Sequence, residues 1–494
     1  MSAARCPRAL PVVRPPVAVP PRAERRTGGV RVSEPGRGAA TGCGAAVYGV
    51  PGGARGDVCG GVSVDRAVSE REDEGPTAGV VARSVDVLVV GGGPAGLAAG
   101  ARLAAAGAGR VEVVERERQA GGIPRHCFHG GFGLRDLRRP MDGPAYARRL
   151  ADDAVAAGAR LRTGTTVTGW DGPRTLLITG PQGLERVTAG AVVLATGARE
   201  RPRAARLVPG TRPAGVYTTG ELQQAVNLYG HPVGTRALVV GADPVAYNAV
   251  LALRTQGVPV VALVTERPPL PAPLSVPLPA LLTRRPVPVL HRTAVAELLG
   301  HGRLSGVRLR HRDGRTGVVA CDTVVFTGDW VPDHELARRG GIPLDPGTRG
   351  PAVDTGYRTA EPSVFAAGNL LRGVERASSA AEEGRAAAER VLAHLAGEPW
   401  PGPGVPVRAE DPLLWVAPNR VHPGGPAPLL GRFVLRTSEP RAAARLTVTQ
   451  DGRLLHRTRL PRPALPGRGL SVRADWLPRV DPDGGAVTVG LTDQ

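Results

Sequence analysis

Apolar runs of strand length alternate with segments of helical periodicity from about residue 84 to residue 397. The first run is VDVLVV at 85–90, and the helical segment PAGLAAGARLAAAGAG follows it directly. AVVLATG at 191–197 and RALVVGA at 236–242 are further apolar runs, and a helical segment at 377–397 closes the region. Continuous apolar strands that alternate with helices are typical of parallel sheets covered by helices on both faces. The pattern therefore predicts an α/β architecture.

The two ends of the chain have different patterns. Residues 1–83 are rich in Pro, Gly, Ala and Arg without periodicity, which predicts a disordered extension. An alternative is that this stretch lies upstream of the true start codon. Beyond a Pro- and Gly-rich linker at 397–407, ARLTVTQDGRLLHRTRL alternates apolar and polar residues with a period of two, and QDGR is typical of a hairpin turn. We therefore expect a small antiparallel β domain at 405–494.

The charge of the chain is strongly positive but evenly spread. The formal net charge is +19, and all 63 basic residues are arginine. A nucleic-acid-binding surface should gather its basic residues in one patch, so this distribution argues against nucleic acid as a partner, although the charge alone keeps that class as a third hypothesis. Because the chain has no lysine, it cannot form a Schiff base with a carbonyl substrate.

Cysteine usage and hydropathy exclude several kinds of site. No two of the five cysteines have CxxC spacing, which argues against a disulfide framework, a structural zinc and a cysteine-ligated iron–sulfur cluster. Arg and Pro interrupt every apolar run near the start, and no run approaches the roughly 18 residues of a membrane span. We expect a cytoplasmic protein without a membrane span. The cysteines are Cys6, Cys43, Cys59, Cys127 and Cys321.

A glycine motif directly follows the first predicted strand. Gly91, Gly93 and Gly96 form G-x-G-x-x-G at the start of the first predicted helix. In this motif the first glycine permits a tight turn, the second lets the backbone approach a diphosphate, and the third allows close helix–strand packing. A second strand, VEVVE, ends in Glu115, 19 residues after Gly96, where a carboxylate can accept a hydrogen bond from a ribose hydroxyl. The arrangement predicts dinucleotide binding.

Three later motifs resemble those of flavoproteins with two dinucleotide-binding domains, of the glutathione-reductase type. They are a glycine doublet at 121–122, the strand end VVLATGARERPR, and YRTAEPSVFAAGN at 357–369. In the last motif this chain has Asn369 where that superfamily has an aspartate that holds the ribityl chain. The resemblance implies FAD as cofactor. It assigns FAD contacts to Gly121, Gly122, Thr196, Gly197, Gly368 and Asn369.

A second strand–turn–helix–strand unit follows, GTRALVVGADPVAYNAVLALRTQGVPVVALVTE. It contains Gly241 in its turn and ends in Glu266, 20 residues after Ala246. In the superfamily this unit binds NAD(P)H. Here Asp243 stands where the diphosphate needs a glycine, so NAD(P) binding stays open from the sequence. If a nucleotide does bind, Glu266 favours NAD over NADP.

A closer resemblance covers about residues 84–397. The stretches that carry it are GGIPRHCFHGGFGLRDL, GPAYARRLADDA, RPAGVYTTGELQQ, FTGDWVPDHELARRGG and AAGNLLRGVE. They resemble FAD-dependent oxidoreductases of the pyridine nucleotide-disulfide type, in the group related to cyanide-synthase and opine-oxidase flavoprotein subunits and to anaerobic glycerol-3-phosphate dehydrogenase. The resemblance implies an FAD-binding domain built from 84–210 and 323–397, with an NAD(P)-binding-like domain at 211–322.

The resemblance also implies a reaction. We expect hydride transfer to flavin from a small amine, amino acid or hydroxy acid; the other redox party would be NAD(P), a quinone, oxygen or a partner subunit. The cysteine-rich iron–sulfur segment that such subunits often carry is missing, so electrons would leave the flavin directly or through a partner. An alternative is a flavin-binding subunit without activity of its own, which requires a dehydrogenase partner.

Catalytic residues cannot be assigned from the sequence, but two groups are candidates. His126, Cys127 and His129 follow the glycine doublet and could tune the flavin or move a substrate proton; alternatively, they are a small buried residue and loop hydrogen-bonders. Two histidines and one cysteine lack a fourth ligand, so we expect no metal. A disulfide between Cys127 and Cys321 is a remote alternative.

The second group lies in GDWVPDH, which either lines an inter-domain cleft or forms a strand-to-loop corner. The helix that begins near Glu375–Ser379 could direct its N-terminus at the flavin, where a helix dipole stabilises negative charge; an ordinary packing helix is the alternative. The residues of the second group are Asp329, Trp330, Asp333 and His334.

Overall fold

The computed structural model describes residues 80–269, 286–373 and 375–493. All of them belong to one unit, Gly75–Gln494. Residues 1–79 of the extension predicted at 1–83 therefore lie outside the described residues. Its last three residues belong to strand β1 (Val81–Val90), which begins four residues before the predicted apolar run.

The first sheet is built around β1, which pairs in parallel with β2 and β8. Strand β5 pairs in parallel with β2, and β19 with β8, while β7 and β6 extend the sheet antiparallel beyond β8. Strand β2 and the second half of β8, on the two sides of β1, are buried, as their continuous apolar runs predict. The bounds are β2 (Val111–Val114), β5 (Arg160–Arg162), β6 (Thr166–Trp170), β7 (Thr175–Gly180), β8 (Gly183–Leu194) and β19 (Val364–Ala366).

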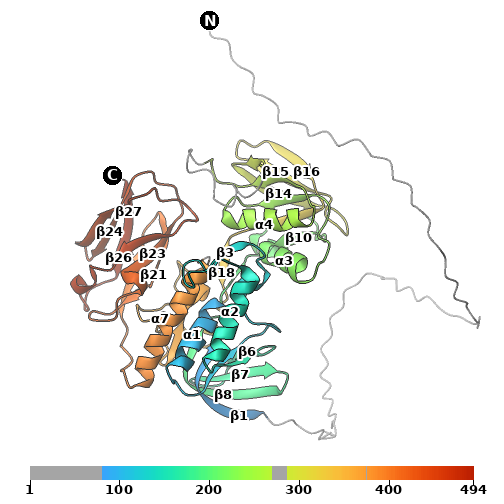
Figure 1. Cartoon of the computed structure of the whole chain (residues 1–494). Helices are drawn as coiled ribbons and strands as arrows, with labels where there is room; N and C mark the ends of the chain where they lie inside the picture. The colour runs from blue at the N-terminus through green and yellow to red at the C-terminus, as the bar shows by residue number, and fades with distance from the viewer. Residues whose placement is uncertain (1–79, 270–285, 374, 494) are drawn as a thin grey trace, which may run out of the picture. The chain divides into compact units, whose positions relative to one another are not determined.

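Three helices pack with this sheet and lie side by side in Figure 1: α1 (Pro94–Ala105), α2 (Gly143–Ala156) and α7 (Ala377–Leu395). Helices α1 and α7 approach closely because glycine stands at their contact. A Cβ on Gly384 would lie 2.0 Å from the carbonyl oxygen of Ala95. The start of α1 and the first turns of α7 are thereby held against each other.

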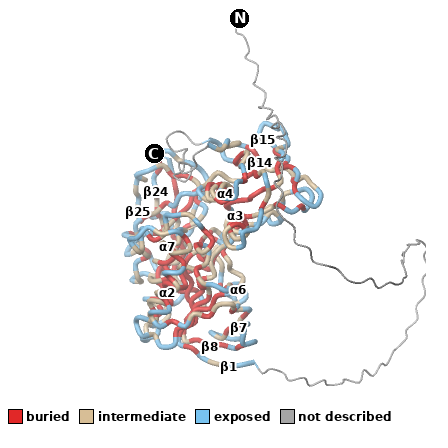
Figure 2. Tube along the Cα trace, turned by 45° about the vertical axis from the view of Figure 1, so that its right-hand side comes forward, coloured by how far each residue is buried: buried red, intermediate tan, exposed pale blue. Residues whose placement is uncertain are grey.

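The second sheet is parallel throughout, in the order β10-β17-β11-β12-β13. Helices α3 (Thr219–Gln223) and α4 (Pro244–Thr255) pack with it. Figure 2 shows buried stretches in red around α3 and α4 and around α2 and α7. The prediction of an α/β architecture is confirmed. The strands are β10 (Val216–Thr218), β11 (Ala237–Val240), β12 (Val260–Val264), β13 (Val289–Leu290) and β17 (Thr323–Phe326).

Shorter elements connect or extend these sheets. Strands β14 (Thr293–Leu299), β15 (Gly306–His311) and β16 (Thr316–Ala320) form an antiparallel sheet. A two-stranded antiparallel link joins β9 to β18, and another joins β3 to β4. The remaining bounds are β3 (Gly130–Phe132), β4 (Met141–Asp142), β9 (Ala198–Glu200), β18 (Trp330–Pro332), α6 (Glu335–Arg339), and the short helices η1 (Ile123–His126), η2 (Arg203–Arg206), η3 (Gln224–Leu228, a π-helix) and η4 (Gly368–Leu370).

Residues 405–493 form two sheets that share one core around Phe433 and Trp476. The predicted hairpin is present: β24 pairs with β25, and Asp451 and Gly452 form the turn with φ of 49° and 77°. One pairing differs from the antiparallel prediction, since β20 pairs with β27 in parallel. The bounds are β20 (Val405–Ala409), β21 (Leu413–Ala417), β22 (Arg420–Val421), η5 (Leu429–Gly431), β23 (Arg432–Thr437), β24 (Ala444–Gln450), β25 (Arg453–Arg459), β26 (Leu470–Arg473), η6 (Leu477–Arg479) and β27 (Val487–Asp493).

Candidate functional site

The turn between β1 and α1, residues 91–96, is called the first turn below. Gly91 has φ of +109°, and a Cβ there would lie 2.4 Å from the carbonyl oxygen of Ala195 at the end of β8. A Cβ on Gly96 would lie 1.9 Å from the carbonyl oxygen of Gly91. Both positions therefore require glycine, for the two reasons that the motif predicts.

The N-terminus of α1 is open. Gly93 is its N-cap, with φ −84° and ψ −175°, and no side chain caps the helix. The nearest atom to a Cβ built on Gly93 would be the Cα of Gly122, at 4.0 Å. The space in front of the helix is therefore bounded by backbone, and a helix N-terminus of this kind binds phosphate through its N–H groups and its dipole.

The glycine doublet lies against the first turn, as the resemblance implies. The Gly121 N–H donates to the Gly92 carbonyl oxygen at 2.7 Å. A Cβ on Gly122 would lie only 3.0 Å from the Cα of Gly93. The structure thus brings together two glycine segments that lie about 30 residues apart along the chain.

Glu115 lies at the end of β2, beside the first turn. One carboxylate oxygen accepts from the Gly92 N–H at 2.9 Å and the other from the Glu117 N–H at 2.8 Å. The residue is 8% exposed. Each oxygen keeps a lone pair, so the carboxylate is both oriented and able to accept from a further hydroxyl.

Thr196 and Gly197 hold the link between β9 and β18. The Thr196 hydroxyl donates to the Asp333 carbonyl oxygen at 2.7 Å, and the Asp333 N–H donates to the Gly197 carbonyl oxygen at 2.8 Å. These two residues follow β8, the strand whose end also contacts Gly91. Their position at the carboxyl end of a parallel strand is where ligands of open α/β sheets bind.

Asn369 closes the loop that leads into α7. Its Oδ1 accepts from the Glu375 N–H at 3.0 Å, and its Nδ2 donates to the Glu375 carbonyl oxygen at 3.4 Å. A carboxylate could make only the first of these bonds, because it has no donor. The amide therefore explains why Asn replaces the superfamily's Asp without loss of local order.

The sequence reasoning missed a buried ion pair beside this loop. Arg372 and Glu383 bond each other, and both are about 4% exposed or less. Glu383 also accepts from the Gly368 N–H at 3.1 Å, and burial raises its pKa. The available signal was an acidic residue among small ones on the inner face of α7, next to Ala380, Gly384 and Ala387.

These features fit FAD. The open helix terminus facing Gly122 offers room and N–H donors for a diphosphate. Glu115 is placed for a ribose hydroxyl, and α7 begins eight residues beyond Asn369. The dinucleotide would therefore be held by the first turn, the glycine doublet and the segment that leads into α7.

The three catalytic candidates in the loop after the glycine doublet, His126, Cys127 and His129, have different surroundings. His126 is 4% exposed, its Nδ1 has no partner among the described residues, and its carbonyl oxygen accepts from Asn227 at 2.8 Å. Burial, with the nearby Arg125 charge, lowers the pKa of His126 to about 4. His129 is instead half-buried and packs on Phe132.

Cys127 is a buried thiol rather than a nucleophile. It donates to the Gln223 side-chain oxygen at 3.4 Å, and burial raises its pKa to about 12. The thiolate is the reactive form, so this cysteine is inert at neutral pH. Cys127 and Cys321 are both free, so the alternative of a disulfide between them is wrong.

The GDWVPDH group forms a structural corner. Asp329 pairs with Arg201 at 2.8 Å, and the His334 Nδ1 lies 2.6 Å from the Arg349 carbonyl oxygen. Burial and the neighbouring Glu335 carboxyl raise the pKa of Asp333 to about 6. Trp330 packs closely on Gly373, where a Cβ would lie 2.4 Å from the Trp330 Cβ. These contacts favour the strand-to-loop alternative.

The turn between β11 and α4, residues 241–246, is called the second turn below. Gly241 has φ of +130°. Asp243 is the N-cap, and its Oδ1 accepts from the Ala246 N–H at 3.2 Å. Glu266, just beyond β12, is exposed. The Glu266 carboxylate would be available to the adenosine ribose of a nucleotide. The diphosphate position, however, holds the Asp243 carboxylate, so the second turn does not fit NAD(P).

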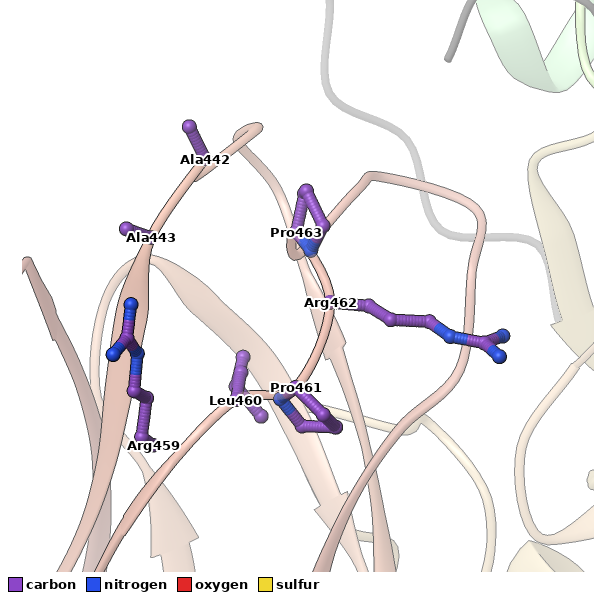
Figure 3. Close-up of a pocket in the computed structure, with 7 residues that line it drawn as sticks. All are labelled: Ala442, Ala443, Arg459, Leu460, Pro461, Arg462 and Pro463. Atoms are coloured by element: carbon purple, nitrogen blue, oxygen red, sulfur yellow. The ribbon is translucent and has the colours of Figure 1, made fainter. Parts of the chain in front are cut away.

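A surface depression of about 380 Å³ lies among residues 442–463. Figure 3 shows that Arg462 points away from Arg459 and that proline and alanine side chains make up most of the lining. None of the residues of either turn lines it, so it is not part of the candidate site. Among the described residues, no helix is both long and apolar enough to cross a membrane.

Comparison with known proteins places the chain in a family. A family model for pyridine nucleotide-disulphide oxidoreductases matches residues 85–384. The chain is 30% identical over 370 residues to the alpha subunit of sarcosine oxidase from Rhizobium meliloti (strain 1021), covering 69% of this chain and 33% of that protein. It is 27% identical over 348 residues to an opine oxidase subunit of Agrobacterium tumefaciens (strain Ach5), covering 63% of this chain and 66% of that protein.

A solved structure shares the fold. The thioredoxin reductase of T. acidophilum superposes with a TM-score of 0.53 at 22% identity, covering 64% of this chain and 100% of that one. The matched region spans only a third of the sarcosine oxidase protein and just under two thirds of the opine oxidase protein. The chain belongs to the pyridine nucleotide-disulphide oxidoreductase family.

Proposed function

We propose that this chain oxidises a small amine, amino acid or hydroxy acid with FAD bound at the first turn. The observation that carries the proposal is the open N-terminus of α1, which faces Gly122 with no side chain in between. Bound FAD would supply the acceptor for a hydride from the donor's C–H bond. The names of the two curated relatives, which belong to a sarcosine oxidase and an opine oxidase, support amine and amino-acid donors within this range.

The chain's own residues would have distinct tasks in this proposal. Gly91, Gly93, Gly96 and Gly122 would admit the diphosphate, and Glu115 would accept from a ribose hydroxyl. The N-terminus of α7 would favour negative charge at the flavin end of the site. Its position is fixed by Asn369 and by the contact of Gly384 with Ala95.

A second candidate is a flavin-binding subunit that depends on a dehydrogenase partner. The support is that both curated relatives are named as subunits, and that the match covers only part of their length. In this case the chain would bind FAD but would not be reduced by a donor alone. The domain division into 84–210 with 323–397, 211–322 and 405–494 is part of the same proposal.

An anaerobic screen of the purified, FAD-loaded full chain separates these candidates. Sarcosine, other N-substituted and simple amino acids, hydroxy acids and NADH are added singly while the visible flavin absorbance is followed. Bleaching by an amine or hydroxy acid supports the first candidate. Flavin that binds but is never bleached by any donor favours the second, and a protein that takes up no FAD contradicts both.

A further inference from the structure

The first and second turns have nearly the same backbone. The N-cap residues Gly93 and Asp243 have φ and ψ of −84° and −175°, and −90° and 176°. Each is followed by a proline at the first helical position, and each turn begins with a glycine at positive φ. The two sites therefore differ chiefly in the side chain that stands at the N-cap.

The Asp243 side chain uses the donor that a phosphate would need. The Ala246 N–H donates both to the Asp243 carbonyl oxygen at 3.1 Å and to its Oδ1 at 3.2 Å. A capping carboxylate also neutralises the positive end of the helix dipole. One N–H group at the N-terminus of α4 is thus already bonded to the chain's own anion.

The other carboxylate oxygen reaches toward the neighbouring strand. A Cβ built on Gly328, which follows β17, would lie 2.9 Å from the Asp243 Oδ2. Strand β11 lies between β12, which the chain forms next, and β17, which it forms only later. A dinucleotide crosses an α/β sheet at such a switch in strand order, outside the carboxyl ends of the strands. Asp243 therefore spans the gap that a diphosphate would occupy.

The nearby charges do not turn this position into an anion site. Glu200 is buried and accepts from the Gly328 N–H at 3.0 Å. The charge of Arg206 interacts with Asp243, but this side chain donates to the Gly328 carbonyl oxygen at 2.6 Å and to the Arg201 carbonyl oxygen at 2.7 Å. These bonds fix the loop, and two carboxylates remain beside the turn.

We infer that Asp243 closes the second turn to a dinucleotide diphosphate. A pyridine nucleotide would then not be the second redox party of this chain, and bound FAD would pass its electrons to oxygen, a quinone or a partner subunit. The inference rests on the proposed function, since it concerns the same flavin. Asp243 is then the residue that excludes a pyridine nucleotide as the electron partner.

The test compares the full-length, FAD-loaded protein with Asp243→Gly and Asp243→Asn. Anaerobic titration with NADH is followed by nucleotide fluorescence and by flavin absorbance. The wild-type protein should show no saturable NADH binding and no bleaching. Asp243→Gly, which removes both charge and bulk, should show saturable NADH binding, with an affinity at least about tenfold above the upper limit that the titration sets for the wild type. Asp243→Asn, which keeps the cap and removes the charge, should lie between them.

Both substitutions suit the helix, because Gly and Asn are among the preferred N-cap residues. Saturable NADH binding by the wild-type protein would overturn the inference, and so would an Asp243→Gly variant as inert as the wild type. FAD content and donor-driven bleaching are measured on the same samples. A failure to bind FAD would contradict the proposed function, whereas nucleotide fluorescence reports on the second turn independently of the flavin.

Discussion

The two nucleotide-type turns of this chain share a backbone and differ in chemistry. In both, a glycine at positive φ ends a buried parallel strand, and a proline begins the helix. The first turn leaves its helix uncapped in front of Gly122, whereas the second caps its helix with the Asp243 carboxylate. The comparison teaches that the fold of a dinucleotide site and its ability to bind are separable. A single side chain at the N-cap decides whether the site can bind a dinucleotide, and it leaves the fold of the turn unchanged.

The largest effect is expected from copying the second turn into the first. Gly93→Asp would place a carboxylate in the space that the diphosphate would occupy, and two like charges about 4 Å apart near a protein surface repel by about 4 kcal/mol. FAD affinity should fall by about a thousandfold, and the purified protein should be colourless. The fold should survive, because Asp243 occupies the same backbone conformation.

Flavin content after gel filtration, together with circular dichroism, measures this outcome. Gly93→Asn is the matched control, because asparagine has nearly the shape of aspartate without its charge and is equally suited to an N-cap position. A yellow Gly93→Asp protein would show that the charge at this position does not govern binding.

Acid should destabilise the protein through the histidine that lies buried near the first turn. The pKa of His126 is lowered from 6.5 to about 4 by burial, so the folded state favours the neutral ring. The free energy of unfolding is therefore unaffected by this histidine above pH 6.5. It falls as the pH drops from 6.5 toward 4, by about 3 kcal/mol in total.

Urea denaturation at about pH 7 and about pH 4.5 would measure this loss. His126→Gln should reduce the difference in unfolding free energy between the two pH values, while His129→Gln, at a half-buried site in the same loop, should change it much less. Equal pH dependence in the wild type and His126→Gln would contradict the assignment.

The third position of the glycine motif is Gly96 in the first turn and Ala246 in the second turn, so each residue can be replaced by the other. Gly96→Ala would force a Cβ to within 1.9 Å of the Gly91 carbonyl oxygen, an overpacking that costs about 1–3 kcal/mol and distorts the first turn. The reverse change in the second turn, Ala246→Gly, should cost about 1 kcal/mol or less, as glycine does within a helix.

Thermal unfolding and FAD content of both variants measure the contrast. Gly96→Ala should lose stability and flavin together, and Ala246→Gly should lose little of either. Similar losses in the two variants would show that the two turns pack equally tightly, contrary to the expectation.

The smallest effect is expected at the loop before α7. Asn369→Asp removes the donor to the Glu375 carbonyl oxygen but keeps the acceptor for its N–H, which should cost about 1 kcal/mol. FAD should remain bound, because aspartate is the residue that the superfamily's motif carries here. A melting temperature equal to that of the wild type would show that the second hydrogen bond contributes nothing.

Much of the nucleotide-binding architecture could be predicted from the sequence, because its signals are local. Buried parallel strands appear as continuous apolar runs, and the steric need for glycine at Gly91 and Gly96 is visible in their spacing. The aspartate at position 243 was also visible. Its effect on the helix terminus required the structure, which shows the bond to Ala246 and the approach to Gly328.

Other features depend on tertiary packing and were not predictable. His126 and His129 lie three residues apart in one loop, yet one is buried and the other only half-buried. The pairing of Arg372 with Glu383 requires α7 to pack beside the loop that follows β19. The parallel pairing of β20 with β27 joins segments about 80 residues apart, and alternation with a period of two predicts a strand but not its partner.

The central claim is that the chain holds one working nucleotide site and one closed one. The most direct test is an equilibrium binding titration of the flavin-free full-length protein with FAD and, separately, with NADH. We expect one equivalent of FAD per chain and no saturable NADH binding. Saturation by NADH in addition to FAD, or binding of neither, would contradict the claim.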